Sequence, residues 1–221
     1  MNDMRFVTLR KAMVDSQIRP NKVIDDQVIE AFSTVPRELF VNRQMQELAY
    51  IDEDLHLSGG RFIIEAMVMA RMVQALKLTP SDNVMCIGAG NGYGAAILSS
   101  LAASVIAVET RIQMVEKAQQ IVAGLDIGNV AVVKSRLQDG YPSEAPYQGI
   151  IIEGGVEYVP QALFDQLSDG GHLVCVLRPR GLDVGEAMIW HKRSDHVTPK
   201  ALFTAQVPVL DEFKLKPKFA F

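Results

Sequence analysis

The sequence predicts an α/β fold built on a doubly wound, mostly parallel sheet. Three observations favour it: a glycine-rich turn follows a short apolar run, a helix of small residues follows the turn, and further apolar runs alternate with helical segments downstream. Strands that alternate with helices are typical of a parallel sheet with helices on both faces. We expect a helical cap at the N-terminus and an antiparallel strand at the C-terminus to complete the fold.

Composition is that of an ordinary globular protein, since 48% of the 221 residues are hydrophobic and 22% are charged. The net charge of −4 does not suggest a nucleic-acid surface or an anionic membrane. No apolar run resembles a signal peptide or a membrane span, so we expect a cytoplasmic protein. Cys86 and Cys175 lie in apolar runs and are expected to be core residues, not a disulfide or a metal site.

The first part of the chain is expected to form the helical cap, residues 1–60, ahead of a core of residues 61–221. Asp25 is placed to cap the helix that follows it. Residues 52–61 are acidic and then glycine-rich, which indicates a loop. The next helix, Ile64–Leu78, carries methionines at helical spacing, which predicts contacts with the core.

The glycine-rich turn contains Gly88, Gly90 and Gly92 in the pattern G-x-G-x-G. Glycines allow a sharp turn and the close approach of a ligand, and the following helix points free N–H groups at that ligand. A second apolar run, residues 104–108, ends in Glu109. An acidic residue at this place is suited to accept hydrogen bonds from a ribose. The sequence therefore predicts a nucleoside-containing cofactor.

Two cofactor classes use this layout. The dinucleotide fingerprint G-x-G-x-x-G needs a glycine at position 93, where this chain has Tyr93. The observed spacing resembles the first motif of class I S-adenosylmethionine methyltransferases and favours S-adenosyl-L-methionine over a nicotinamide cofactor. Ala89 and Thr110 are then expected to contact it together with the glycines and Glu109. An α/β fold that kept its turn and binds nothing remains an alternative.

Downstream segments complete the expected core. We expect a helix at 111–125, strands at 130–133, 149–153 and 172–177, a helix at 160–167, and an antiparallel pair at 186–192 and 198–209. Glu153 ends one of these strands, where open α/β sheets place ligand-facing residues, so it is expected to contact the cofactor or the acceptor. The tail, residues 214–221 with Phe219 and Phe221, is expected to pack on the sheet.

Longer stretches carry a more specific resemblance. The segments MVDSQIR, VIDDQVIEAFSTVPRELFV and LAYIDEDLHL, followed later by APYQGIII and VPQALFDQLSDGGHLV, resemble protein-L-isoaspartate O-methyltransferases. The sequence is identified as a divergent member of that family over roughly residues 10–178. The resemblance implies that S-adenosyl-L-methionine methylates a carboxylate of isoaspartyl residues in a protein or peptide substrate.

The resemblance also implies an acceptor loop. In the family, the loop after a glycine pair carries Thr-x-Ser followed, one residue later, by proline. The matching positions here are Phe62, Ile64 and Ala66, and with Gly60 they are expected to line the catalytic site. The loop hydroxyls are missing, which puts activity on isoaspartyl peptides in doubt or indicates another acceptor.

Two departures concern the cofactor. Cys86 stands where these methyltransferases usually carry an acidic residue, and Arg136 where the family has an acid for the adenine amino group. A guanidinium cannot accept that hydrogen bond, although backbone groups of Ser135 and Leu137 could still hold adenine. A non-catalytic binding or regulatory protein and a methyltransferase for a different small acceptor therefore remain alternatives.

Overall fold

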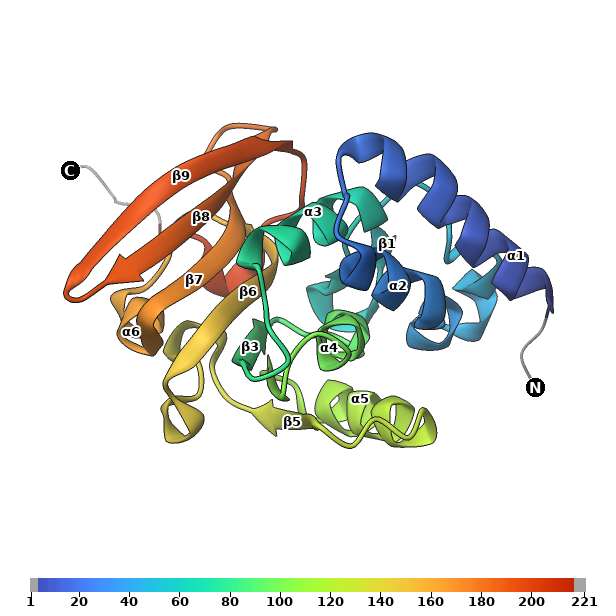
Figure 1. The fold of residues 1–221 in the computed structure, drawn as a ribbon, viewed down its shortest axis with the longest axis horizontal. Helices are drawn as coiled ribbons and strands as arrows, with labels where there is room; N and C mark the ends of the chain where they lie inside the picture. The colour runs from blue at the N-terminus through green and yellow to red at the C-terminus, as the bar shows by residue number, and fades with distance from the viewer. Residues whose placement is uncertain (1–3, 217–221) are drawn as a thin grey trace.

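A seven-stranded sheet forms the centre of the computed structural model, which describes residues 4–216 (Figure 1). The strand order is β5-β4-β3-β6-β7-β8-β9. The strands are β3 (Asn83–Ile87), β4 (Ser104–Glu109), β5 (Val130–Lys134), β6 (Tyr147–Val156), β7 (Leu167–Leu177), β8 (Gly185–Arg193) and β9 (His196–Ala205). Strands β3 to β7 are parallel, whereas β8 pairs antiparallel with both β7 and β9. The predicted doubly wound sheet with an antiparallel end is confirmed.

The helices surround this sheet. The α-helices are α1 (Met4–Met13), α2 (Asp26–Thr34), α3 (Ala66–Leu76), α4 (Tyr93–Ser99), α5 (Ile112–Gly124) and α6 (Gln161–Asp165). A π-helical turn, Val14–Ile18, continues α1, and a short ribbon pairs β1 (Leu55–His56) with β2 (Phe62–Ile63). Helices α1 and α2 lie at the end of the molecule opposite β8 and β9, with α3 between them (Figure 1). The division into a cap and a core stays a prediction, because one continuous hydrophobic core joins both parts.

The beginning of α2 follows the expected capping chemistry. The Asp25 carboxylate accepts hydrogen bonds from the backbone N–H groups of Gln27 and Val28, at 2.9 and 3.3 Å. These bonds satisfy donors that the first turn of a helix leaves without a partner. On α3, Met69 and Met72 are buried in the core, as their spacing predicted. Both cysteines are free and buried.

Three element boundaries differ from the expectation. Helix α3 begins at Ala66 because Phe62 and Ile63 pair with β1 as a strand. Strand β7 begins at Leu167, ahead of the expected start at residue 172, and its pairing with β6 shifts register between Leu167 and His172. The last strand ends at Ala205, and the chain then crosses β6, where Val209 bridges Gly155.

Two expectations concern the C-terminal tail and membrane-spanning helices. Phe219 and Phe221, for which packing on the sheet was expected, lie outside the described residues. Within residues 4–216, no helix has the length and apolar character needed to cross a membrane.

Replacing Asp25 with alanine should lower the free energy of unfolding by about 1 kcal/mol, because two N–H groups of α2 lose their acceptor. Urea denaturation followed by circular dichroism measures the change. Asp26→Ala is the matched control, since Asp26 lies one residue further on and the cap does not use its side chain. Equal losses for the two variants would contradict the capping role.

Candidate active site

The glycine turn lies at the point where the sheet order reverses. Gly88, Gly90 and Gly92 all have positive φ angles, +75°, +55° and +94°, which glycine adopts without a Cβ clash. The backbone N–H groups of Gly88 and Ala89 donate to the carbonyl of Val108 at 3.0 and 3.3 Å, which holds the turn against the end of β4. The crevice beyond the carboxyl ends of β3, β4 and β6 is where open α/β sheets bind ligands.

Glu109 occupies the end of β4, but its carboxylate is 0% exposed and bound to the chain itself. The Arg61 guanidinium donates from Nε to Oε2 and from Nη2 to Oε1, both at 2.9 Å. Backbone N–H groups of Gly90 and Thr110 donate to the same two oxygens, at 3.2 and 2.6 Å. Both carboxylate oxygens expected to receive ribose hydroxyls are therefore already satisfied.

Arg61 also joins the end of the chain to this ion pair. Its Nη2 lies 2.7 Å from Oε1 of Glu212, and its Nη1 lies 3.1 Å from Oε2 of that carboxylate. Burial alone would lower the pKa of the Arg61 guanidinium, but its bonds to Glu212 and Glu109 raise it. Burial would raise the pKa of Glu212, but its hydrogen bonds from Arg61 lower it. The three groups form one charged, mutually dependent cluster.

The C-terminal segment, residues 206–213, closes the crevice. The backbone N–H of Leu210 donates to the carbonyl of Gly155 at 2.9 Å, and the backbone N–H of Gly155 donates to the carbonyl of Pro208 at 2.8 Å. These bonds place the Leu210 side chain so close to the chain that a Cβ at Gly154 would lie 2.5 Å from its Cγ. At Gly88, a Cβ would lie 3.1 Å from Leu210 Cδ1. The glycines thus make room for a side chain of the same protein.

In this conformation the residues of the crevice do not fit S-adenosyl-L-methionine. The glycine turn is buried, and Leu210 lies against its first glycine. A Cβ at Gly90 would meet Leu57 Cδ1 at 3.1 Å, so a second apolar side chain lies against the middle of the turn. Binding there requires the C-terminal segment and the Arg61 side chain to move.

Glu153 contacts Cys86 on the neighbouring strand. The thiol Sγ lies 2.6 Å from the carboxyl Oε1, and both side chains are buried. Burial raises the pKa of Glu153 from its ordinary value of 4.5 to about 8, so this carboxyl group is neutral at pH 7. Burial, and then the nearby Glu153, raise the pKa of the Cys86 thiol as well. The expected contact of Glu153 with a cofactor or acceptor stays a prediction.

The segment expected near adenine is divided between the core and the surface. Leu137 is buried and lies near Gly88, whereas the Arg136 side chain is 74% exposed and lies 3.6 Å from Asp139. Ser135 N–H donates to the backbone carbonyl of Glu109 at 3.0 Å. The structure thus brings Leu137 and Ser135 to the crevice and leaves the Arg136 guanidinium in solvent.

The loop expected to hold the acceptor faces the core. Phe62 and Ile64 are buried, at 6% and 1% exposure, whereas Gly60 is exposed. Arg37 is wholly buried, and it donates to the carbonyls of Ile64 and Ala49 at 2.9 and 2.8 Å. This arginine holds the loop to the helical cap.

The sequence reasoning missed Arg37, Arg61, Leu210 and Glu212. Only Arg61 had a visible signal, since it is a cation between the glycine pair and the apolar run Phe62–Ile64.

Arg61→Met should lower the free energy of unfolding by about 3–5 kcal/mol, because it leaves the Glu109 carboxylate buried without a cation. The double variant Arg61→Met/Glu109→Gln should lose less than the sum of the two single variants, because no unpaired charge remains. Urea denaturation of the four proteins measures this coupling. Additive losses would show that the buried pair does not interact as described.

Glu153→Gln should change how stability depends on pH. Between about pH 5 and about pH 8 the unfolded chain has released the Glu153 proton while the folded chain retains it, so the native protein loses stability as pH rises. Glutamine does not titrate, so the variant should gain stability relative to the native protein across this range. Urea denaturation at a series of pH values tests this, and a constant difference would contradict the raised pKa.

Comparisons with known proteins identify relatives of this chain. The family model for protein-L-isoaspartate(D-aspartate) O-methyltransferase matches residues 8–212. A protein-L-isoaspartate O-methyltransferase of Methanoculleus marisnigri is 37% identical over 77% of this chain and 78% of its own length. One from Rhodopseudomonas palustris is 39% identical over 76% of this chain and 69% of its own length.

Solved structures agree as well. A protein-L-isoaspartate O-methyltransferase structure superposes with a TM-score of 0.81 at 25% identity, covering 91% of this chain. This chain spans 65% of that longer protein. A Plasmodium falciparum protein of this name, in complex with S-adenosyl-L-homocysteine, gives a TM-score of 0.75 at 17% identity, covers 92% of this chain and 98% of its own, and shares the fold. The chain belongs to the protein-L-isoaspartate(D-aspartate) O-methyltransferase family.

Proposed function

We propose that this chain methylates the carboxylate of isoaspartyl residues in proteins with S-adenosyl-L-methionine, and that the described conformation is a closed form of the enzyme. The observation that carries the proposal is the position of Gly88–Gly92 and Glu109. In a chain of this family, both lie at the crevice where the sheet order reverses. Gly88, Ala89, Gly90, Gly92, Glu109, Thr110, Ser135, Leu137 and Glu153 are the proposed cofactor contacts, with Arg136 left at the surface.

The chemistry of the acceptor is compatible with the apolar loop. A carboxylate has an ordinary pKa near ~4 and is ionised at neutral pH, so its methylation needs no general base. What the protein must supply is orientation and exclusion of water. Phe62 and Ile64 are apolar and buried in this conformation, and Gly60 contributes exposed backbone at the end of the loop. These properties suit exclusion of water better than recognition by hydroxyl groups.

Closure by the C-terminal segment reduces the affinity for the cofactor. If only a fraction of molecules is open, the apparent dissociation constant rises by the inverse of that fraction. Glu212 contributes to closure because it binds Arg61 while Arg61 holds Glu109. Weakening the bond of Glu212 to Arg61 should therefore strengthen cofactor binding without touching Glu109.

A second candidate is a non-catalytic binding or regulatory protein that retains the methyltransferase fold. The Arg61–Glu109 ion pair favours it, since the chain supplies its own partner to the carboxylate that a ribose would use. The missing loop hydroxyls favour it as well. The two candidates differ in whether any S-adenosyl compound binds at all.

Calorimetric titration with S-adenosyl-L-homocysteine separates them. The native protein should bind it, and Glu212→Ala should lower the dissociation constant by at least about fivefold, because the open fraction rises. Glu116→Ala is the matched control, since it removes an exposed glutamate of α5 that has no bond to Arg61. Transfer of labelled methyl to an isoaspartyl peptide, but not to its aspartyl counterpart, then tests the acceptor.

Two results would contradict the enzyme proposal. Failure of both the native protein and Glu212→Ala to bind at millimolar concentration would support the non-catalytic candidate. Binding of S-adenosyl-L-homocysteine without methyl transfer to the isoaspartyl peptide would support the proposed cofactor and exclude the isoaspartyl acceptor. Circular dichroism of each variant shows whether a loss of binding is a loss of folding.

A further inference from the structure

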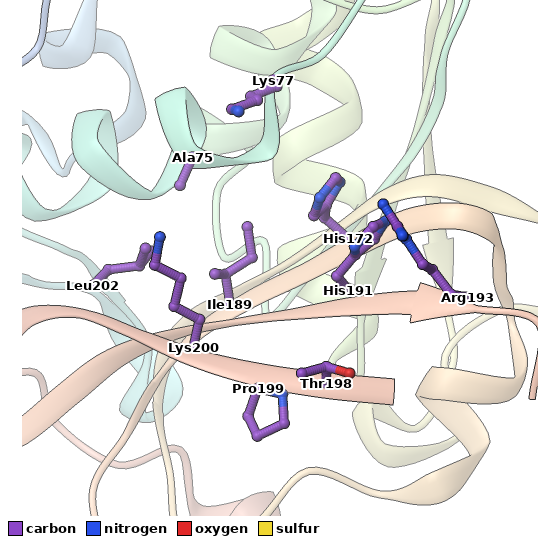
Figure 2. A pocket seen from close by; sticks show the side chains of 10 residues that line it. All are labelled: Ala75, Lys77, His172, Ile189, His191, Arg193, Thr198, Pro199, Lys200 and Leu202. Carbon is purple, nitrogen blue, oxygen red and sulfur yellow. The ribbon is translucent and has the colours of Figure 1, made fainter. Parts of the chain in front are cut away.

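A hollow of about 510 Å³ lies between the end of α3 and the sheet formed by β7, β8 and β9 (Figure 2). None of the residues assigned above to the cofactor or acceptor lines it. Its basic residues come from four elements: Lys77 after α3, His172 on β7, His191 and Arg193 on β8, and Lys200 on β9. No aspartate or glutamate is part of its lining.

The register of the sheet explains why these side chains converge. His172, His191 and Thr198 are paired across the three strands, and Val174, Ile189 and Lys200 are paired two residues further along. Side chains two residues apart point to the same face of a sheet. In Figure 2, the two imidazoles lie on one side of the open space, Lys200 lies on the other, and Lys77 lies above.

The basic groups of the hollow have no partner of opposite charge. Among the residues that the structure describes, the side chains of Lys77, His172, His191, Arg193 and Lys200 make no hydrogen bond and no ion pair. The two imidazole rings stack on each other, with centroids 4.6 Å apart and planes 11° from parallel. Like charges gathered in this way repel one another, so the arrangement favours a bound anion.

Neighbouring cations show the contrast. Lys192, the residue after His191, donates to the carbonyls of Phe164, Asp165 and Leu167 at 3.0, 3.3 and 2.8 Å. Arg71 on α3 lies over the Phe203 ring, 3.6 Å from its centroid. Lys192 and Arg71 thus have an evident structural role. The negative end of the α3 dipole favours one cation nearby, which explains the position of Lys77 but not those of the other basic residues in the hollow.

The hollow also has an apolar part. Ala75, Ile189 and Leu202 contribute apolar surface between the basic groups. Its volume falls within the range of small-molecule sites, roughly 300–1,000 Å³, and far exceeds a single inorganic ion. A fitting ligand therefore has an organic body together with its anionic group.

We propose that this hollow binds a small organic phosphate. Its phosphate group would lie among the side chains of His172, His191, Lys77 and Lys200, and its organic body would lie over Ile189 and Leu202. A phosphate monoester carries up to two negative charges and three terminal oxygens. It therefore uses several separate donors, whereas a monocarboxylate carries one charge and two oxygens. The site does not depend on the proposed methyl transfer.

Protonation should be coupled to this binding. Burial, with His191 and Lys77 nearby, lowers the pKa of His172. The charged or titratable groups that face it are Lys77 from α3, His191 and Arg193 from β8, and Lys200 from β9. A bound dianion would offset the repulsion by Lys77 and raise the pKa of the His172 imidazole, so binding should be tighter below neutral pH than above it.

Three probes test the proposal on the full chain: 1-naphthyl phosphate, 1-naphthoate and inorganic phosphate. We expect 1-naphthyl phosphate to bind more tightly than either of the others, because only it supplies both the dianion and the apolar body. Nuclear magnetic resonance of the imidazoles should show the pKa of His172 rising on binding. His56 and His196 are internal controls, since they lie outside the hollow.

Charge variants locate the site. Lys77→Ala and Lys200→Ala should each weaken binding of 1-naphthyl phosphate by about tenfold, which is the loss of one charge-assisted hydrogen bond. Lys134→Ala on the far edge strand β5 is the matched control and should leave binding unchanged. All three side chains belong to exposed residues, so the variants should fold.

Several outcomes would overturn the proposal. No binding of 1-naphthyl phosphate at millimolar concentration would do so, as would binding that Lys77→Ala and Lys200→Ala leave unchanged. If inorganic phosphate bound as tightly as 1-naphthyl phosphate, the organic body would not contribute to binding. If 1-naphthoate bound more tightly than 1-naphthyl phosphate, phosphate would not be the preferred anionic group.

Discussion

The buried ion pair between Arg61 and Glu109 is the constraint on which the arrangement of the crevice depends. Neither charge can remain in the interior without the other, because removing an ion from water costs several kcal/mol. The two residues are 48 positions apart, and Glu212 is a further 103 positions along the chain from Glu109. Their pairing therefore brings the loop ahead of β2, the end of β4 and the C-terminal segment to one place.

Under the proposed function, this constraint places the cofactor in competition with the chain. Ribose hydroxyls are neutral, so they can replace the hydrogen bonds that Glu109 receives but not the positive charge of Arg61. A molecule that opens must keep Arg61 near a carboxylate or expose the guanidinium to water. Glu212, which is partly exposed, lies on the C-terminal segment and binds Arg61 while Arg61 binds Glu109. Its contact therefore stabilises the closed form, and the cost of opening depends on the C-terminal segment.

The fold could be read from the sequence because its signals are local. The apolar runs, the glycine turn and the Asp25 cap each act within a few residues, and the structure has all of them. Most of the closed crevice could not be read in this way. Leu210 lies against Gly88 and Gly154, far away in sequence, and an apolar residue after a strand gives no sign of where it will pack.

Residue type alone also does not give the environment of a side chain. Arg136 was considered for its charge at the adenine position, yet its guanidinium lies in solvent, while Leu137 beside it is buried near Gly88. Glu153 contacts Cys86 across adjacent strands, and its expected contact with a ligand stays a prediction. In both cases the direction of the side chain decides its partner, and direction follows from tertiary packing.

The crevice and the hollow differ in how their charged groups are paired. At the crevice every buried charge has a partner within the chain, so a ligand there must first displace protein contacts. At the hollow beside β8 and β9 the basic groups lie together without a counter-charge from residues 4–216, so an anion need not break a described ion pair. A site that needs no rearrangement binds without the penalty of an opening step. The hollow is therefore prepared for its ligand in the described conformation, whereas the crevice becomes so only after Arg61 and Leu210 have moved.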